Sequence, residues 1–221
     1  GEKERKAKTK VDIVIPLYNK AEYTKACLES LEATRGEVPF RVILVDNGST
    51  DGTSVLLEAW QDRAEVVRPG DNLGFAKGNN LGASYGDSPY VLFLNNDTVA
   101  EAGWLDRMVA EMDANPDIGI AGAKLLYPNR VIQHAGLEII NGVPDHVYRN
   151  APEDDSQANV ARDLDMITGA CLMIRRELFE TIGGFDTGYV NGVEDVDLCL
   201  RVRDRGFRVR YVPEAVLAHH E

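Results

Sequence analysis

From residue 11 onward the chain alternates between short apolar runs and amphipathic stretches of helical period. The apolar runs, rich in β-branched residues, predict strands at 11–16, 42–45, 65–68 and 90–94. The stretches that follow them predict helices at 21–33, 53–60, 75–85 and 101–115. Strands and helices that alternate in this way are joined by right-handed crossovers into a parallel sheet. The alternation therefore predicts an α/β fold, with a Rossmann-like, mainly parallel sheet flanked by helices.

The second half of the chain is less regular. It predicts strands at 118–126, 136–141 and 207–212, and helices at 175–182 and 194–205. Between them, residues 143–162 are polar and rich in Asp, Asn and Pro, which is typical of a surface excursion: a mobile loop or a flap on the acceptor side. Pro16 is expected to end the first strand, because proline has no amide hydrogen for the ladder. No linker divides residues 11–221, so we expect a single domain.

Composition excludes several classes of protein. Residues 1–10 are almost all charged or small, which favours a linker or tail and suggests that the domain belongs to a longer multidomain chain. A net charge of −12 opposes binding to a nucleic-acid backbone. The apolar runs fall far short of the ~20 residues that cross a bilayer, and no signal peptide opens the chain. We therefore expect a cytoplasmic protein, with membrane association through other domains or partners as the alternative.

The three cysteines are Cys27, Cys171 and Cys199, widely spaced and without a Cys-x-x-Cys pair. A disulfide framework or a zinc site would need paired spacing. The pattern predicts free, buried thiols in a reducing compartment.

Polar segments follow three of the predicted strands. They are Pro16–Asn19, Asp46–Gly52 and Asn95–Asp97. Each taken alone also fits a turn or a helix N-cap. In an open parallel sheet, however, ligands bind outside the carboxyl ends of the strands, and all three segments lie at that edge. Their convergence predicts a ligand site, in which a carboxylate such as Asp97 suits a hard divalent cation.

Two predicted helices begin with unusual residues. Asn72–Asn80 holds two interior glycines, each unfavourable in a helix by about 1 kcal/mol, which close approach of a ligand or a loosely packed helix start would explain. Glu194, Asp195 and Asp197 open another helix, where acids stabilise the dipole by about 0.3–1 kcal/mol. The same position also suits a general base that takes a proton from a hydroxyl.

Two adjacent histidines, His219 and His220, follow the strand-like residues 215–218. A histidine at a strand end is either a bystander or a nitrogen ligand for a metal, and the spacing does not choose between these roles. Neither a Walker loop nor Gly-x-Gly-x-x-Gly is present, so the sequence does not support a P-loop protein or a dinucleotide-binding protein.

Taken in order, the motifs resemble the inverting family-two glycosyltransferases of the GT-A fold, especially their rhamnosyltransferase-like branch. The matching segments are Val14–Asn19, Val45–Gly52, Asn72–Ala76, Leu94–Asp97, Gly169–Arg176, Gly183–Asp186 and Glu194–Leu198. The resemblance spans Val11 to His220, nearly the whole chain.

The resemblance implies a role for individual residues. The nucleotide-sugar-binding positions are Pro16, Tyr18, Asn19, Asp46, Asn72, Gly74, Lys77, Asn95, Asn96 and Gly169. Among them, Asp46 accepts from the base and Gly169 leaves space for the donor sugar. The family's Asp-X-Asp motif is represented by Asn95-Asn96-Asp97, so its first acid is replaced by an uncharged amide.

The resemblance also implies the chemistry. Asp97 and one histidine would hold Mg²⁺ or Mn²⁺, and His219 matches the family position better than His220. Asp195 would be the catalytic base, with Glu194 as the fallback. The implied reaction moves a sugar from a dTDP-, UDP- or GDP-sugar to a hydroxyl of a saccharide or lipid-linked glycan acceptor, in surface polysaccharide or glycan assembly. It is a single displacement with inversion, in which the metal stabilises the departing diphosphate.

Two other functions remain to be weighed. A sugar nucleotidyltransferase has a similar sheet, but it usually carries a glycine-rich basic loop after the first strand, and Pro16–Asn19 offers neither glycine nor cation. A non-catalytic nucleotide-sugar-binding module would need no placed base, and the presence of Asp195 argues against it. The donor sugar, its base and the acceptor are not specified by the sequence.

Overall fold

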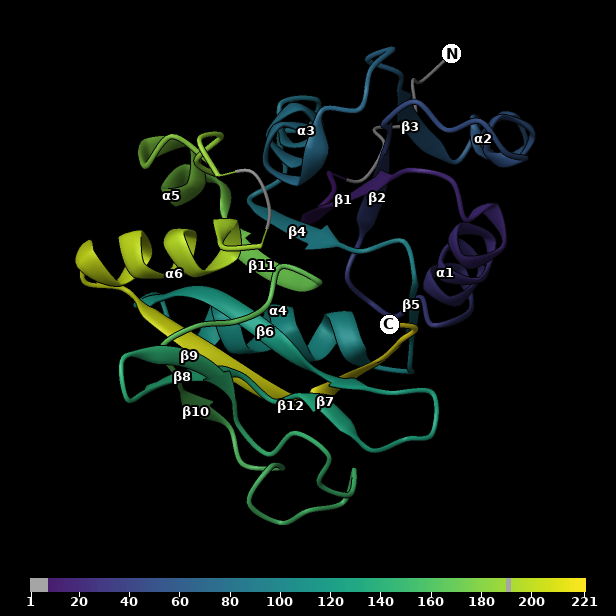
Figure 1. Cartoon of the computed structure of the whole chain (residues 1–221). Coiled ribbons are helices and arrows are strands. Elements are labelled where there is room, and N and C mark those ends of the chain that lie inside the picture. The colour runs from purple at the N-terminus through teal and green to yellow at the C-terminus, as the bar shows by residue number, and fades with distance from the viewer. Residues whose placement is uncertain (1–7, 190–191) are drawn as a thin grey trace.

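The computed structural model describes residues 8–189 and 192–221. Figure 1 shows a large sheet with helices on both faces. In chain order, the elements are β1 (Val11–Leu17), α1 (Ala21–Ala33), β2 (Phe40–Asp46), α2 (Thr53–Trp60), β3 (Ala64–Val67), α3 (Gly74–Ala83), β4 (Tyr90–Leu94), β5 (Thr98–Ala100), α4 (Trp104–Ala114), β6 (Ile118–Leu126), β7 (Ile132–His134), β8 (Leu137–Ile140), β9 (Val143–His146), β10 (Arg162–Asp163), β11 (Cys171–Arg175), α5 (Arg176–Thr181), α6 (Glu194–Asp204) and β12 (Arg208–His219).

The main sheet has the order β10-β12-β6-β11-β4-β1-β2-β3, with β5 beside β12 and β7 beside β6. Strands β1 to β4 are the four predicted from the alternation, and they pair in parallel. Strand β11 runs antiparallel between β4 and β6, and β12 returns parallel to β6. The expected α/β fold is confirmed, and its sheet is parallel in the first half and mixed in the second.

Each face of the sheet has its own hydrophobic core. Along β4, Leu92 and Leu94 pack into the core beneath α1, α2 and α4. Val91 and Phe93 point the other way, into the core beneath α3, α5 and α6. Successive side chains of a strand face opposite sides, and both sides are covered here. This is why the central strands are apolar throughout rather than alternating.

Prolines do not end strands where they were expected to. Strand β1 continues through Pro16 to Leu17, because its pairing with β4 stops at Val14 while its pairing with β2 goes on. Beyond Val14 the proline's missing amide therefore costs no bond to β4. The final strand was expected to end at 212, yet β12 passes Pro213 through a register shift and reaches His219.

Short strands were missed by the sequence analysis. The predicted helix at 101–115 begins only at Trp104, after the three-residue β5. Strands β7 and β9 have three and four residues and were not expected. The polar segment 143–162 is largely exposed, but it contains β9 and buries Ala158, so part of it is folded onto the sheet.

Residues 1–7 of the expected tail lie outside the described residues. Thr9 and Lys10 belong to the fold, since the Thr9 hydroxyl lies 2.6 Å from that of Ser88 and the Lys10 amide donates to the Pro39 carbonyl over 2.8 Å. The boundary therefore lies about two residues earlier than expected.

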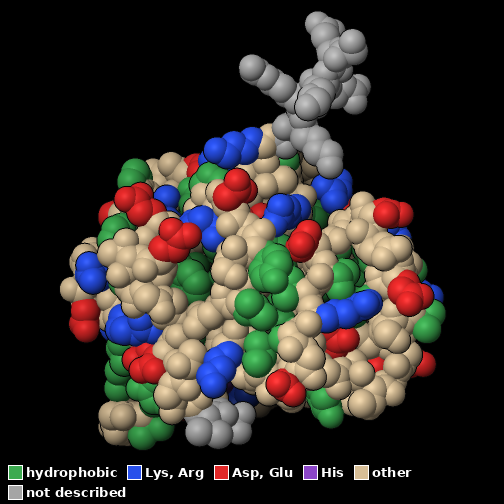
Figure 2. Space-filling view, turned by 90° about the horizontal axis from the view of Figure 1, so that it is seen from above, with side chains coloured by type: hydrophobic (Ala, Val, Ile, Leu, Met, Phe, Trp, Pro, Cys, Tyr) green, Lys and Arg blue, Asp and Glu red, His purple; other side chains and the backbone are tan. Residues whose placement is uncertain are grey.

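Three further expectations concern the whole chain. Cys27, Cys171 and Cys199 are free and buried, as predicted. In residues 8–189 and 192–221, no helix combines the length and the apolar character that crossing a membrane requires. Figure 2 shows basic and acidic side chains interspersed over the face seen from above, rather than a basic patch.

Candidate active site

The loops after β1 and β2 are tied to each other at one edge of the sheet. The Asn19 amide donates to Ser49 Oγ over 2.8 Å, and the Thr50 amide donates to Asn19 Oδ1 over 2.7 Å. Asp46 Oδ1 accepts from the Ser49 amide over 3.0 Å. The side chains of Asn19 and Asp46 thus shape the loop as well as bordering the site. These bonds bring together the first two of the three polar segments that were expected to converge.

Helix α3 lies close to these loops. Asn72 Oδ1 accepts from the Gly74 amide over 2.9 Å, and Gly74 has a positive φ of 76°. At Gly78, a Cβ would lie 3.1 Å from Asn47 Nδ2, so the small residue permits this close approach. Lys77 is exposed on the same helix. Gly74 and Gly78 therefore have two functions: a turn at the start of the helix and contact with the loop after β2.

Buried amides without partners lie in the same region. Asn47 is 5% exposed with its Oδ1 unbonded, and Asn79 is fully buried with both amide atoms unbonded within the described part of the chain. Such groups cost free energy unless something satisfies them. Tyr18, at the end of β1, is half exposed.

The segment after β4 is anchored on both sides. The Asn95 amide donates to the Ala170 carbonyl over 2.9 Å, and Asn96 Nδ2 donates to Thr24 Oγ1 over 3.0 Å. The side chain of Asn96 is therefore held by α1. This anchoring directs Asp97 toward the end of β12.

Asp97 faces His219 rather than His220. His219 Nε2 lies 3.0 Å from Asp97 Oδ1, and their side chains are only 5% and 14% exposed. His220 instead packs its ring against Tyr23, with centroids 5.4 Å apart. Burial raises the pKa of Asp97, but the hydrogen bond and charge of His219 outweigh burial and lower that pKa below its usual value. Of the two histidines, His219 is therefore the one that lies against Asp97.

The pair also fits a divalent cation. The other ring nitrogen, His219 Nδ1, lies 2.7 Å from Gln133 Oε1. Since a carbonyl oxygen only accepts, Nδ1 carries the hydrogen and a neutral ring has its lone pair on Nε2. His219 Nε2 and Asp97 Oδ1 lie 3.0 Å apart, and without a hydrogen on Nε2 both atoms are acceptors. In that form the two acceptors suit a cation between them, whereas in the metal-free protein a hydrogen on Nε2 bridges them equally well.

Two side chains alone do not form a complete metal site. Within residues 8–189 and 192–221, no group of three or more His, Cys, Asp or Glu side chains is placed to hold a metal. A cation on Asp97 and His219 would take its remaining ligands from water or from a bound diphosphate.

Asp195 is held at the start of α6 by the loop before β11. Its Oδ2 accepts from the Gly169 amide over 2.8 Å, and Oδ1 accepts from the Val196 amide over 2.9 Å. Burial raises the pKa of Asp195, and the two amides oppose that rise without cancelling it. Glu194 is 4% exposed and accepts from the Gly192 amide over 2.8 Å, so its carboxylate is engaged in its own turn.

The resemblance implied that Gly169 leaves open space for the donor sugar, but the space beside this glycine is filled. A Cβ there would meet the Phe75 ring at 2.7 Å and the Asp195 Cβ at 3.3 Å. The glycine instead allows Phe75 and Asp195 to pack against the loop.

A histidine pair beside this loop was missed by the sequence analysis. His134 Nε2 accepts from the Thr168 amide over 3.4 Å, so its hydrogen lies on Nδ1, which is 3.1 Å from His146 Nδ1. Burial lowers the pKa of both rings, that of His134 far below its usual value. Polar residues within the three-residue β7 carry no periodic signal, which explains why they were overlooked.

The segment that carries Asp97 and the helix start that carries Asp195 both contact residues 168–170. Ala170 holds the amide of Asn95, while Gly169 holds the carboxylate of Asp195. A continuous set of contacts thus connects Asp97 with Asp195.

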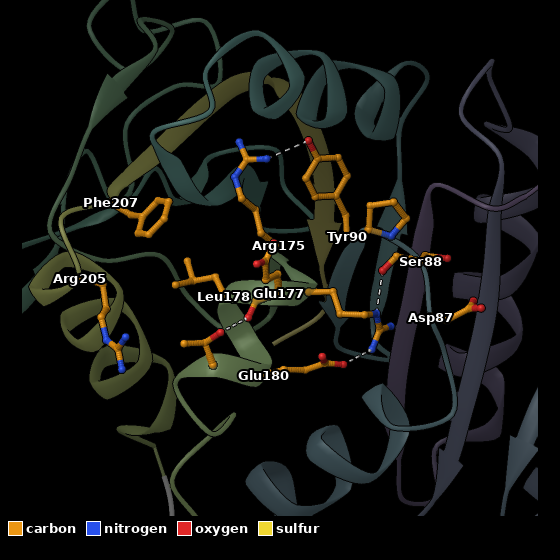
Figure 3. A pocket seen from close by; sticks show the side chains of 12 residues that line it. Asp87, Ser88, Tyr90, Arg175, Glu177, Leu178, Glu180, Arg205 and Phe207 are labelled. Carbon is orange, nitrogen blue, oxygen red and sulfur yellow. Dashed lines mark hydrogen bonds and ion pairs between the residues drawn. The ribbon is translucent and has the colours of Figure 1, made fainter.

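A pocket of about 730 Å³ lies elsewhere, at the amino end of β4 (Figure 3). Two of its three arginines are engaged: Arg175 Nη1 donates to the Tyr90 hydroxyl over 3.3 Å, and Arg176 Nε donates to the Ser88 carbonyl over 2.7 Å. The pocket shares no residue with the candidate site, which follows the opposite end of the strand.

Comparison with known families decides the assignment. The sequence model described as "Glycosyl transferase family 2" matches residues 12–183. The chain belongs to glycosyl transferase family 2. A second model, described as "N-terminal domain of galactosyltransferase", matches residues 155–220 of this family-2 domain.

Curated relatives of the family-2 domain include two bacterial proteins with named functions. It is 34% identical over 221 residues to "O-antigen biosynthesis protein RfbC" of Myxococcus xanthus, a match that covers 96% of this chain and 17% of that protein. It is 28% identical to "N-acetylglucosaminyl-diphospho-decaprenol L-rhamnosyltransferase" of Mycobacterium tuberculosis, with 95% of this chain and 75% of that protein covered. The domain therefore spans less than a fifth of the O-antigen protein.

Solved structures share the fold. "Mannosyltransferase PcManGT from Pyrobaculum calidifontis in complex with GDP-Man and Mn2+" has a TM-score of 0.71 and 21% identity, over 96% of this chain and 57% of that one. "GalNAc-T7 with UDP, GalNAc and Mn2+" has a TM-score of 0.80 and 15% identity, over 99% of this chain and 45% of that one. The GT-A fold expected from the sequence is confirmed.

Proposed function

We propose that this family-2 domain is an inverting glycosyltransferase that moves a sugar from a nucleoside-diphosphate sugar to an acceptor hydroxyl. The observation that carries the proposal is the pairing of the Asp97 carboxylate with the His219 imidazole, Oδ1 to Nε2 3.0 Å apart, with a separate carboxylate held by the adjoining loop. Asp97 and His219 suit a cation that binds the diphosphate, and the Asp195 carboxylate suits a general base.

Asp195 serves as that base. Its raised pKa makes the carboxylate a stronger proton acceptor than an ordinary aspartate. The amides of Gly169 and Val196 fix its orientation, so that it can remove the proton from an acceptor hydroxyl during a single displacement. Glu194 is a poorer choice, because it is only 4% exposed, whereas Asp195 is partly exposed.

Asp97 and His219 are the metal-binding residues. A carboxylate oxygen beside an imidazole nitrogen favours Mn²⁺ over Mg²⁺, which prefers oxygen ligands alone. When bound, the cation supplies positive charge to the departing diphosphate. Two of the related solved structures contain Mn²⁺ in their titles, which supports this choice.

The nucleotide lies over the loops after β1 and β2. Tyr18 is exposed there, and Asp46, Asn47 and Asn79 present polar groups near the start of α3. The titles of the solved structures name GDP-Man and UDP, so we propose a dTDP-, UDP- or GDP-sugar as the donor without choosing among the three. The names of the curated relatives favour a rhamnosyl or related donor and a saccharide or lipid-linked acceptor in surface glycan assembly.

One experiment separates this proposal from the two alternatives. A panel of sugar nucleotides is screened by thermal shift, since a bound ligand raises apparent stability with its affinity. The best donor, radiolabelled on the sugar, is then incubated with protein and Mn²⁺. Slow metal-dependent release of the sugar supports the transferase. Synthesis of the sugar nucleotide from a sugar phosphate and a nucleoside triphosphate indicates a nucleotidyltransferase, and binding without turnover indicates a module.

A further inference from the structure

Gln133 lies at an irregular point of the sheet. Strand β7 pairs antiparallel with β6, with Leu125 opposite His134 and Leu126 opposite Ile132. Two adjacent residues of β6 thus face residues of β7 that are two apart, which leaves Gln133 as the extra residue of a β-bulge. Bulges re-aim side chains and occur next to active sites.

The bulge directs the Gln133 carboxamide inward. The residue is 3% exposed, and its Oε1 lies 2.7 Å from His219 Nδ1. Its Nε2 has no partner in the described part of the chain. Half of the buried amide's hydrogen-bonding capacity is therefore unused, so its contribution to folding does not explain its position. The contact that it does make is with His219.

That contact determines which nitrogen of His219 is free. Because Oε1 only accepts, it requires the hydrogen on Nδ1, so Nε2 is the ring nitrogen that faces Asp97 and is available to a metal. In metal sites, the second ring nitrogen of a histidine ligand almost always donates to such an acceptor, which fixes its tautomer and orientation. The Glu221 carboxylate is the other acceptor near Nδ1, but it is 3.9 Å away and 72% exposed.

We propose that Gln133 is a positioning residue for the metal ligand His219: its carbonyl oxygen holds the ring in the Nδ1–H form, with Nε2 directed at the cation. Gln133 itself does not touch the metal or the substrate. The inference rests on the proposed function, because it assumes that Asp97 and His219 hold a divalent cation.

The test compares Gln133→Met with Gln133→Glu. Methionine has nearly the same length but no acceptor, whereas glutamate keeps an oxygen at the same place. Mn²⁺ affinity is measured by electron paramagnetic resonance of free Mn²⁺, in the presence of whichever of dTDP, UDP or GDP gives the largest thermal shift. We expect about 10- to 100-fold weaker Mn²⁺ binding in Gln133→Met. Gln133→Glu and the control Glu221→Gln should stay within about threefold of the unchanged protein, a margin well below the effect of losing such a partner.

A second readout does not need the metal. In the metal-free protein, ¹⁵N NMR of the His219 ring should show a hydrogen on Nδ1, whether or not Nε2 also carries one, and Gln133→Met should lower the population with a hydrogen on Nδ1. Unchanged Mn²⁺ affinity in Gln133→Met together with an unchanged tautomer overturns the inference. So does a loss of affinity in Glu221→Gln as large as that in Gln133→Met. Circular dichroism confirms that each variant is folded.

The two readouts also separate this inference from the proposed function. If the unchanged protein binds no Mn²⁺ with any of the three nucleotides, the proposed metal use fails and the inference fails with it, whatever the tautomer. If the unchanged protein binds Mn²⁺ and Gln133→Met shows the same Mn²⁺ affinity and the same His219 ring state, the metal site stands and the role of Gln133 is wrong.

Discussion

Asp195 and Asp97 are two partly buried carboxylates whose pKa values move in opposite directions. Burial dominates at Asp195 and raises its pKa, whereas the hydrogen bond and charge of His219 outweigh burial at Asp97 and lower it. A raised pKa favours a proton acceptor, and a lowered one favours a permanently charged ligand. The two environments therefore match the two roles that we propose.

Replacing the base should separate binding from turnover. We expect Asp195→Asn to leave donor affinity within about twofold and to lower the transfer rate by about 10²–10⁴-fold, the usual contribution of a general base. Donor affinity from calorimetry and initial rates measure the two effects. Asp204→Asn, at the exposed end of the same helix, is the matched control and should change neither. An Asp195→Asn variant with full activity would exclude this residue as the base.

Removing the metal ligand should have the opposite signature. Asp97→Ala takes away the only carboxylate that faces His219 Nε2 among the described residues, so donor binding should lose its dependence on Mn²⁺. Calorimetry with and without Mn²⁺ measures this, and Asp62→Ala, an exposed aspartate after α2, is the control. The assignment is wrong if Asp97→Ala still binds donor more tightly with Mn²⁺ than without it.

At the scale of elements, the loop at residues 168–170, which holds Asp195, contacts a neutral histidine pair contributed by β7 and β9. Burial keeps the pKa of His134 far below the usual value of 6.5, and His146 follows in the same direction. The unfolded chain takes up these protons as the pH falls below about 6.5, while the folded chain does not. Folding is therefore favoured above that pH and weakened below it.

The resulting prediction concerns stability against pH. Between about pH 6.5 and 5, the free energy of unfolding should fall with acidification by up to about 1.4 kcal/mol per pH unit for each such histidine. His134→Gln should reduce this slope. Urea titrations at several pH values measure it, and an identical slope in the variant would show that His134 takes up its proton equally well in the folded state.

The elements that the sequence predicts and those that it misses differ in a physical way. Strands such as Tyr90–Leu94 are buried on both faces by crossover helices, so their apolar runs are self-evident. Strand β7 owes its existence to pairing with β6, and its sequence, Ile132-Gln133-His134, has no period of its own. The site residues carried by the predicted strands could thus be named in advance, whereas Gln133 and His134 could not.

At the scale of the molecule, a buried ion pair connects the first strand with the second half of the chain. Asp12 is fully buried in β1 and accepts from Arg176 Nη2 of α5 over 2.6 Å and from the Ser88 amide over 2.9 Å. Nothing in the sequence pattern pairs residues 164 positions apart. This pair stands at the edge of the sheet opposite the candidate site.

Breaking the pair should destabilise the fold without altering the chemistry. Asp12→Ala leaves the Arg176 guanidinium without its buried partner, and we expect a loss of about 3–5 kcal/mol in the free energy of unfolding. Chemical denaturation measures the loss. Below the new melting temperature, donor affinity should be unchanged, because the site lies at the other end of β1. A loss below about 1 kcal/mol would contradict this expectation.

We propose that a cation on Asp97 and His219 and a base at Asp195 act together on one donor. The most direct test is the initial rate of sugar release from the donor found in the screen, followed across pH with Mn²⁺ and with a chelator. We predict a rate that requires Mn²⁺ and declines on acidification at a pH above that of an ordinary aspartate, because burial raises the pKa of Asp195. A rate that persists in chelator, or an acid limb unchanged by Asp195→Asn, would contradict the account.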